Sequence, residues 1–277
     1  MKRAATQRGF SLLELLTAAA IFVILCGAAF GLLSVTQRSY QNESQLLSSF
    51  QEARLALDEI VRDVSVAGFP PSSQFSNVTL NTNRDYFAYS PLAWSPGYTS
   101  ATPNPCAIGG GCVTPGDFDM IVESNIDLEQ DRVNNLEDVE WVRYRLGTGA
   151  GSTTLFRGVT QKNHSADPDG ATLATLVPFV QNVMNNASAA QIAQFQALYP
   201  SMFSGGGPVP IFRYVCDDAG TLKRCDSVFS GNNTPVNVQE VEVTLIVQSP
   251  QLDPVTGNPR LVMLNGRGHR VNPKAGP

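Results

Sequence analysis

A single acidic residue, Glu14, stands at the start of an apolar segment long enough to cross a membrane. Residues 15–35 contain no Lys, Arg, Asp or Glu, and this length is about the 20 residues that a helix needs to span a bilayer. Three basic residues precede the segment: Lys2, Arg3 and Arg8. They predict that the short N-terminus stays in the cytoplasm and that the chain after the apolar segment is exported.

The position of Glu14 distinguishes this segment from simpler membrane signals. A carboxylate at the centre of a membrane helix costs roughly 2.5–3.5 kcal/mol, and less near the end of the helix. Each large aliphatic residue contributes roughly 0.3–0.6 kcal/mol in favour of membrane insertion, so insertion of the segment remains favourable. A secretory signal has an apolar core of about 7–15 residues followed by its cleavage site. Here the run is longer, and Arg8-Gly9 precedes it. A plain anchor would not need the acid.

The run Arg8-Gly9-Phe10-Ser11-Leu12-Leu13-Glu14-Leu15 resembles the cleavage and assembly signal of type IV pilin-like proteins. In that family a short basic leader ends in Gly, Phe usually follows, and the fifth mature residue is Glu. The resemblance implies that a prepilin peptidase cuts between Gly9 and Phe10 and methylates the new amine. It also implies that Glu14 offsets the charge of a neighbouring subunit's N-terminal amine in a filament. Such pairing would explain the acid, because intramembrane charges persist mostly when paired.

The helix is predicted to continue past the membrane and to end before Pro70-Pro71. Apolar residues recur at spacings of four and three and form one stripe: Leu46, Phe50, Ala53, Leu57, Ile60 and Val64. Most charged residues of this stretch, among them Asp63, fall off the stripe. Residues 10–69 contain no Pro, and Gly68 favours a stop. A helix of about 57 residues would be roughly 85 Å long.

Four segments follow from this pattern. Residues 1–9 form the leader, residues 10–35 the helix of the membrane or filament core, and residues 36–69 the amphipathic half of the same helix. Residues 70–277 form an exported, β-rich globular domain. The mature chain would carry a formal charge of −8, because three positive charges leave with the leader from a chain of −5. A mildly acidic chain without a basic cluster argues against nucleic-acid binding.

The fold class is predicted as α+β, with one long helix packed on an antiparallel β-sheet. Residues 238–247 alternate most clearly between apolar and polar side chains. Residues 173–184 fit either a strand or a helix, and residues 188–198 read as a helix. The Pro- and Gly-rich segments 90–115 and 204–210 are expected to be surface loops. The candidate strands are 85–89, 118–123, 139–146, 154–157, 211–216, 238–247 and 261–264.

Two further segments narrow the resemblance to particular groups of type IV pilin-like proteins. Residues 54–63, followed by Ala67-Gly68-Phe69, look like the helix end of PilW-like minor pilins. Residues 142–146 with Leu155-Phe156-Arg157 resemble a hairpin shared by PilW-like proteins and J-type pseudopilins of type II secretion. The likeness covers the helix well and the globular part loosely. Because Glu14 is present, the chain does not match the K-type tip pseudopilin, which characteristically lacks that acid.

The predicted function is a structural one, that of a PilW-like minor pilin in a tip or priming complex. The resemblance implies three kinds of partner: other pilin or pseudopilin subunits, the prepilin peptidase, and the inner membrane before assembly. The N-terminus would be cytoplasmic and the globular domain exported, with the mature protein ending in a surface or periplasmic filament. One alternative is a J-type minor pseudopilin of a type II secretion system. The other is a membrane-anchored exported adhesin or enzyme.

The cysteines agree with export. Cys26 lies in the apolar segment and is interpreted as a small packing residue. In an oxidising compartment the other four favour two short-loop disulfides, each contributing roughly 2–3 kcal/mol, although four cysteines allow three connectivities. The local pairs are Cys106 with Cys112 and Cys216 with Cys225. A zinc site is disfavoured because neither pair is a Cys-x-x-Cys and the two histidines have no nearby ligand partner.

A calcium loop is the one metal hypothesis with some support. Asp127, Glu129 and Asp131 place oxygen ligands at alternate positions, as Ca²⁺ coordination requires. However, Arg132 occupies the position where an EF-hand loop needs Gly. We therefore interpret the segment as a solvated acidic loop before a strand, and we expect no cofactor.

No catalytic pattern is present in the sequence, so the chain is predicted not to be an enzyme. There is no Gly-x-Ser-x-Gly elbow and no His-Glu-x-x-His pair. The glycines of residues 147–151 predict a hairpin turn and no phosphate loop, and no small-molecule substrate is evident. Asp117 and Asp119 are interpreted as carboxylates of a wet strand edge. Trp94 and Tyr98 could form an adhesive patch or cover the edge of the core.

Overall fold

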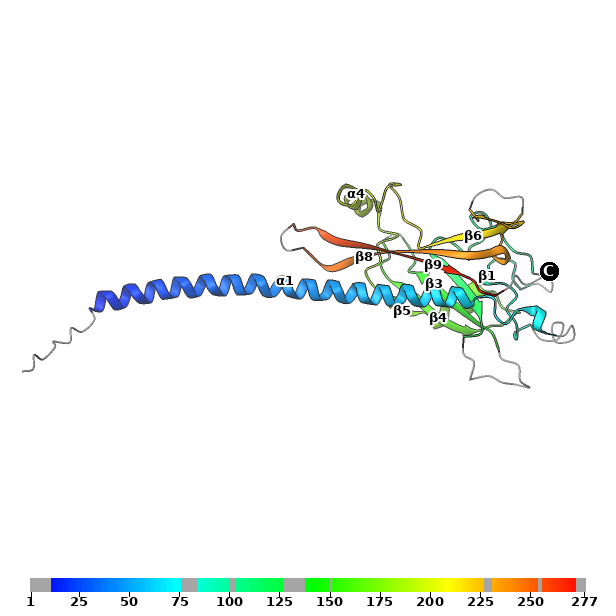
Figure 1. Ribbon diagram of the computed structural model, residues 1–277, viewed down its shortest axis with the longest axis horizontal. Coiled ribbons are helices and arrows are strands. Elements are labelled where there is room, and N and C mark those ends of the chain that lie inside the picture. The colour runs from blue at the N-terminus through cyan, green and yellow to red at the C-terminus, as the bar shows by residue number, and fades with distance from the viewer. Residues whose placement is uncertain are drawn as a thin grey trace, which may run out of the picture.

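A helix of 55 residues, α1 (Leu12–Val66), dominates the computed structural model and extends well beyond the globular head (Figure 1). The model describes residues 11–75, 84–99, 103–126, 138–149, 151–226, 231–253 and 256–272. Ser11 caps the N-terminus of α1, and Ala67 caps its C-terminus. Gly68 follows with φ of 80°, a conformation that glycine adopts without strain. The predicted long helix and its stop are confirmed.

The head contains two antiparallel sheets, which confirms the predicted α+β class. The first has the strand order β1-β2-β3-β4-β5, and the second has the order β7-β6-β8-β9. The first sheet comprises β1 (Leu92–Ala93), β2 (Asp119–Ser124), β3 (Glu140–Leu146), β4 (Leu155–Gln161) and β5 (Val177–Val180). The second comprises β6 (Phe212–Asp218), β7 (Thr221–Arg224), β8 (Val238–Leu252) and β9 (Pro259–His269).

Short helical segments connect the strands. The longest of them, α4 (Ala189–Leu198), begins at the capping residue Ser188, as the sequence predicted. The others are η1 (Ser72–Gln74), α3 (Pro168–Ala171), η2 (Leu173–Thr175) and η3 (Pro235–Asn237). The ambiguous segment 173–184 forms a 3₁₀ turn followed by β5. The glycines of residues 147–151 connect β3 to β4, as expected of a hairpin turn.

The second half of α1 packs into the core along β8 and β9 (Figure 1). The predicted stripe is buried from Ala53 onward, while Leu46 and Phe50 are half-buried. Two glycines of β9 allow the helix to approach closely. A Cβ on Gly268 would lie 2.6 Å from Cγ1 of Val64, and one on Gly266 would lie 2.8 Å from Cδ1 of Leu57. Small residues on this strand therefore set the spacing between the helix and the sheet.

Two predictions about the head were wrong. Residues 85–89 form no strand within the described stretch 84–99, where Ala88 makes only an isolated bridge to Pro71. The stretch 90–115, predicted as a surface loop, contributes β1, Trp94 and Tyr98 to the core. The error arose because Pro and Gly signal a change of direction and do not determine exposure, whereas large aromatic side chains are stabilised by burial.

Candidate assembly site

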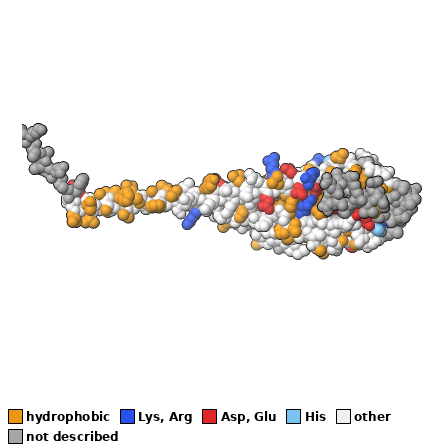
Figure 2. Space-filling model, turned by 90° about the horizontal axis from the view of Figure 1, so that it is seen from below, with side chains coloured by type: hydrophobic (Ala, Val, Ile, Leu, Met, Phe, Trp, Pro, Cys, Tyr) orange, Lys and Arg blue, Asp and Glu red, His pale blue; other side chains and the backbone are white. Residues whose placement is uncertain are grey.

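The first half of α1 presents an apolar surface that the head does not cover. Hydrophobic side chains surround this projecting part, with Leu12 76%, Phe22 67% and Phe30 70% exposed (Figure 2). Among the described residues, α1 is the helix long and apolar enough to span a membrane, and its apolar window is 0% buried within the chain. An apolar surface of this extent marks contact with lipid or with other protein.

Glu14 is fixed at the beginning of this surface by a capping box. The backbone N–H of Ser11 donates to Oε2 of Glu14 at 3.0 Å, and Oγ of Ser11 accepts from the backbone N–H of Leu13 at 3.3 Å. A carboxylate in the first turn also interacts favourably with the helix dipole. The carboxylate is thus held beside the residue that follows Phe10. Gly9 and Phe10 themselves lie outside the described residues.

Two threonine hydroxyls in the projecting half of α1 are satisfied within the helix. Oγ1 of Thr17 donates to the carbonyls of Leu13 (3.1 Å) and Glu14 (3.0 Å), and Oγ1 of Thr36 donates to the carbonyl of Leu32 (2.9 Å). Such internal bonds matter because lipid offers no partners to polar groups. The side chain of Cys26 is a free thiol in the same segment. Glu14 is therefore the one charged side chain of residues 12–35.

Asp63 joins the helix to the head. Oδ2 of Asp63 accepts a hydrogen bond from the Tyr144 hydroxyl at 2.7 Å and one from Arg157 at 3.2 Å. Arg157 also pairs with Glu59 at 3.1 Å. Burial, and then the charge of Asp63, raise the pKa of the Tyr144 phenol well above its usual value. The helix is thus connected to β3 and β4 by charged and polar groups as well as by apolar packing.

Sequence reasoning missed this contact because it placed Asp63 off the apolar stripe, whereas Asp63 is 1% exposed. The signal was present, since Asp63 lies at helical spacing within a run of buried residues: Ala53, Ala56, Ile60, Asp63 and Ala67. An acid on such a run predicts a buried partner from another element.

The C-terminal end of α1 is bonded to both sheets. The carbonyl of Val66 accepts from Oγ of Ser124 (2.8 Å) on β2 and from Nδ2 of Asn272 (2.9 Å), which follows β9. The N–H of Gly68 donates to the carbonyl of Glu123 at 2.8 Å. These bonds satisfy groups that a helix end would otherwise leave without partners.

Glu123 and Lys162 form an ion pair inside the head. Nζ of Lys162 lies 2.8 Å from Oε1 of Glu123, and both side chains are almost fully buried. Tyr98 and Trp141 donate to the other carboxylate oxygen, Oε2, at 2.5 and 3.4 Å. Trp94 packs on Tyr98 in the same cluster. Trp94 and Tyr98 therefore belong to the core, and the adhesive-patch interpretation of these two residues was wrong.

Arg143 forms a second buried ion-pair cluster. It makes two hydrogen bonds to Asp119, at 2.8 and 2.5 Å, and also pairs with Asp169. Burial raises the pKa of the Asp119 carboxyl, and the bond to Arg143 opposes this effect. Asp119 is therefore part of a buried cluster, and its interpretation as a carboxylate of a wet strand edge was wrong. Asp117 is exposed. The charged side chains of each cluster pair with one another, so both clusters stabilise the fold of the head.

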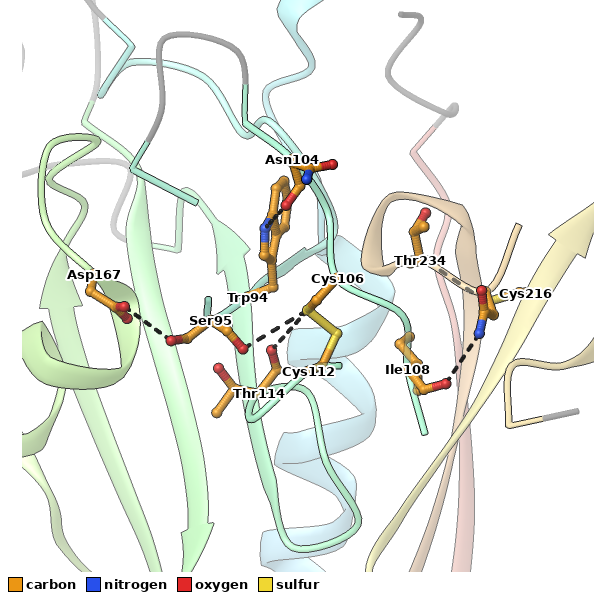
Figure 3. Close-up of a disulfide and its surroundings, with 11 residues drawn as sticks. Trp94, Ser95, Asn104, Cys106, Ile108, Cys112, Thr114, Asp167, Cys216 and Thr234 are labelled. Atoms are coloured by element: carbon orange, nitrogen blue, oxygen red, sulfur yellow. Dashed lines mark hydrogen bonds between the residues drawn. A yellow bond between two sulfur atoms is a disulfide. The ribbon is translucent and has the colours of Figure 1, made fainter. Parts of the chain in front are cut away.

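Two disulfides have the local pairing expected from the sequence: Cys106 with Cys112 and Cys216 with Cys225. The first closes a loop that packs beside Trp94, whose indole N–H donates to the Asn104 carbonyl at 3.2 Å (Figure 3). The second joins β6 to the end of β7. Ile108, inside the first loop, donates its N–H to the Asn233 carbonyl at 2.8 Å. This contact connects the first loop to the segment before η3.

The calcium hypothesis stays a prediction, because Asp127, Glu129 and Asp131 lie outside the described residues. Within the described part of the chain, no three His, Cys, Asp or Glu side chains are grouped so as to hold a metal ion. The two histidines instead have acidic neighbours, His164 with Asp85 at 3.0 Å and His269 with Glu240 at 3.1 Å.

The comparison with family models agrees with the N-terminal pattern. Residues 5–30 match the family model described as the prokaryotic N-terminal methylation motif. The comparison with curated proteins gives no match. Among solved structures, the chain is similar to a type IV-like pilin from Thermus thermophilus, with 12% identity and a TM-score of 0.38, covering 79% of this chain and 94% of that one.

Proposed function

We propose that this chain, a type IV pilin-like protein with an N-terminal methylation motif, is a minor subunit of a bacterial type IV filament. Its role is structural and non-enzymatic. The motif implies processing by a prepilin peptidase, anchoring in the inner membrane and assembly with other pilins. The finer assignment, a PilW-like subunit of a tip or priming complex, is supported by the helix end at residues 54–69 and by the β3–β4 hairpin.

The observation that carries the proposal is the division of α1 into two surfaces. Its second half is held in the head by Asp63 and the apolar stripe, while residues 12–35 project uncovered. Lipid would cover this surface before assembly, and the helices of other subunits would cover it in the filament. A helix with a fully apolar circumference is stable only when it is surrounded in this way.

Gly9 and Phe10 carry the processing in this proposal, and Glu14 carries assembly. The capping box aims the carboxylate of Glu14 at the N-terminal end of α1. A methylated amine on Phe10 of a neighbouring subunit would offset that charge. An acid and an amine buried together cost less than either one alone.

The test replaces Glu14 with Val and compares the variant with Glu43→Gln, a change on an exposed part of the same helix. We expect Glu14→Val to enter the membrane and lose its leader, and to fall about tenfold or more in sheared filaments. Glu43→Gln should assemble as the wild-type chain does. Equal incorporation of Glu14→Val would contradict the assembly role.

The alternative is a J-type minor pseudopilin of a type II secretion system, because the hairpin formed by β3 and β4 is the feature that both families share. The two machines use the same processing and the same helix packing. Deleting the gene distinguishes them. Loss of surface filaments with normal protein secretion supports the pilus, and loss of secretion with normal filaments supports the pseudopilin.

A further inference from the structure

A groove of about 490 Å³ lies on the head, away from the projecting half of α1. Four segments form it: the loop 108–112, the segment 115–118, the start of β6 at 210–214, and the turn 224–226. This volume lies within the range of about 300–1,000 Å³ that is typical of ligand sites. The groove takes no part in the assembly role proposed above.

The walls of the groove are built from segments that covalent bonds hold in place. Cys106–Cys112 closes the loop that forms one wall, and Cys216–Cys225 fixes the turn that forms another. The two walls meet where Gly109, with φ of 79°, approaches Asp226. A Cβ on Gly109 would lie 3.3 Å from Cα of Asp226. A site with fixed walls loses little conformational entropy when it binds a ligand.

The floor of the groove is apolar, and two of its backbone carbonyls already have partners. The half-buried side chains of Phe118 and Pro210 line it. The Tyr214 hydroxyl donates to the carbonyl of Gly116 at 2.8 Å. The carbonyl of Asp117 accepts from the N–H groups of Ile211 (2.9 Å) and Phe212 (3.0 Å). Recognition of a polar ligand would therefore depend on side chains.

Two charged side chains of opposite sign in the groove have no hydrogen bond or ion pair within the described part of the chain: Asp117 and Arg213. Partial desolvation raises the pKa of the exposed Asp117 carboxyl, and the charge of Arg213 opposes this effect, so the two charges lie close enough to interact. The other two charges of the groove, Arg224 and Asp226, pair with each other at 2.9 Å.

We propose that the groove binds a short peptide segment of a partner protein that carries one carboxylate and one cationic side chain. Arg213 would pair with the carboxylate, Asp117 would pair with the cation, and the apolar part of the segment would lie on Phe118 and Pro210. A guanidinium fits a carboxylate through two parallel hydrogen bonds.

The charges of the groove favour this class of ligand over two others. Its four charged side chains sum to zero, which is unfavourable for a polyanion such as a nucleic acid. A neutral oligosaccharide would cover Asp117 and Arg213 without neutralising either, and this would cost the desolvation of both groups. A segment with both charges satisfies both side chains.

The experiment uses the full chain in detergent micelles and two pools of fluorescein-labelled pentapeptides. One pool has the pattern X-Glu-X-Lys-X and the other X-Gln-X-Gln-X, with X drawn from Val, Thr and Tyr. Fluorescence anisotropy measures binding. We expect the charged pool to bind, and Arg213→Gln and Asp117→Asn each to weaken binding about tenfold, or ~1.4 kcal/mol. Lys223→Gln, which lies on β7 and does not line the groove, is the matched control.

Near-UV circular dichroism of each variant would verify that the head remains folded. Equal binding of the two pools would overturn the proposal, as would retention of binding by Arg213→Gln. Displacement of the peptides by maltohexaose at low concentration would favour an oligosaccharide site. Failure of the charged pool to bind up to about 1 mM would also overturn it.

Discussion

Asp63 on the helix accepts a hydrogen bond of 2.7 Å from the hydroxyl of Tyr144 on β3, and both side chains are buried. The two residues are 81 positions apart in the sequence. This bond lies near the C-terminal end of α1, in the half of the helix that packs in the head. It couples the part of the chain that would join a filament to the part that would be displayed on it.

Asp63→Asn should weaken the connection between helix and head. The change removes the charge that Arg157 and Tyr144 share and leaves Glu59, which is partly exposed, as the acidic partner of Arg157. We expect the free energy of unfolding to fall by about 2–4 kcal/mol, since breaking a buried pair costs about 3–5 kcal/mol and the amide retains part of the bonding. Urea unfolding of the full chain in detergent measures this. Asp58→Asn, exposed on the same helix, should change stability by less than about 0.5 kcal/mol.

Stability should fall at alkaline pH because three tyrosines are buried. Burial raises the pKa of the phenols of Tyr98, Tyr144 and Tyr214 above the ordinary value. The unfolded chain loses these protons above about pH 10, while the folded chain keeps them. The stabilisation is therefore complete below about pH 9 and decreases as the pH rises past 10, by about 1.4 kcal/mol per pH unit for each tyrosine.

The urea midpoint between pH 7 and 11 measures this dependence. Tyr144→Phe should make the decline shallower, and Tyr40→Phe, on the exposed part of α1, should not. Full ionisation of all seven tyrosines in the folded protein near pH 11, seen in the phenolate absorbance, would show that these three are not protected.

Two buried arginines should respond in opposite ways to replacement by Met. Arg143→Met removes the buried partner of Asp119 and Asp169 and leaves Asp119 with the more exposed Arg145 at 3.5 Å, and we expect a loss of about 3–5 kcal/mol. Arg270 is 4% exposed, and within the described structure its Nε and Nη2 make no hydrogen bond. Burial lowers the pKa of its guanidinium. Arg270→Met should leave stability unchanged or raise it by about 1–3 kcal/mol. A large loss from Arg270→Met would indicate a partner for this side chain.

The two disulfides should each stabilise the head by roughly 2–3 kcal/mol, as expected for short loops. The variants to compare are Cys106→Ser/Cys112→Ser and Cys216→Ser/Cys225→Ser, each measured by urea unfolding. Cys26→Ala serves as the control, because this thiol is free in the projecting helix. Thiol labelling of the denatured, unreduced wild-type chain should find one reactive cysteine. Three or five reactive cysteines would contradict the pairing.

The sequence predicted the fold best where a pattern is local and repeated. Three features could be predicted because they depend on neighbouring residues: the apolar stripe of α1, the end of this helix before Gly68, and the alternation in β8. The strand β9 is longer than predicted because Gly266 and Gly268 read as loop residues, whereas the close approach of Leu57 and Val64 requires glycine there.

The polar contacts inside the head could not be predicted from local sequence patterns. Asp63, Glu123 and Lys162 look like surface residues in a linear sequence, because charged side chains are rarely buried without a partner. Among their charged partners on other elements, Arg157 lies 94 residues from Asp63, and Glu123 and Lys162 lie 39 residues apart. Trp94 and Tyr98 were misjudged for a related reason, since a Pro-rich segment can turn inward when it carries large aromatic side chains.

Processing at Gly9 is tested by the N-terminal mass of the native protein, with and without an active prepilin peptidase. We predict a mature chain that begins at N-methylated Phe10 when the peptidase is active, and an intact leader ending at Gly9 when it is not. An intact leader in both cells, or cleavage after the apolar segment, would contradict it and would leave Glu14 without an explanation.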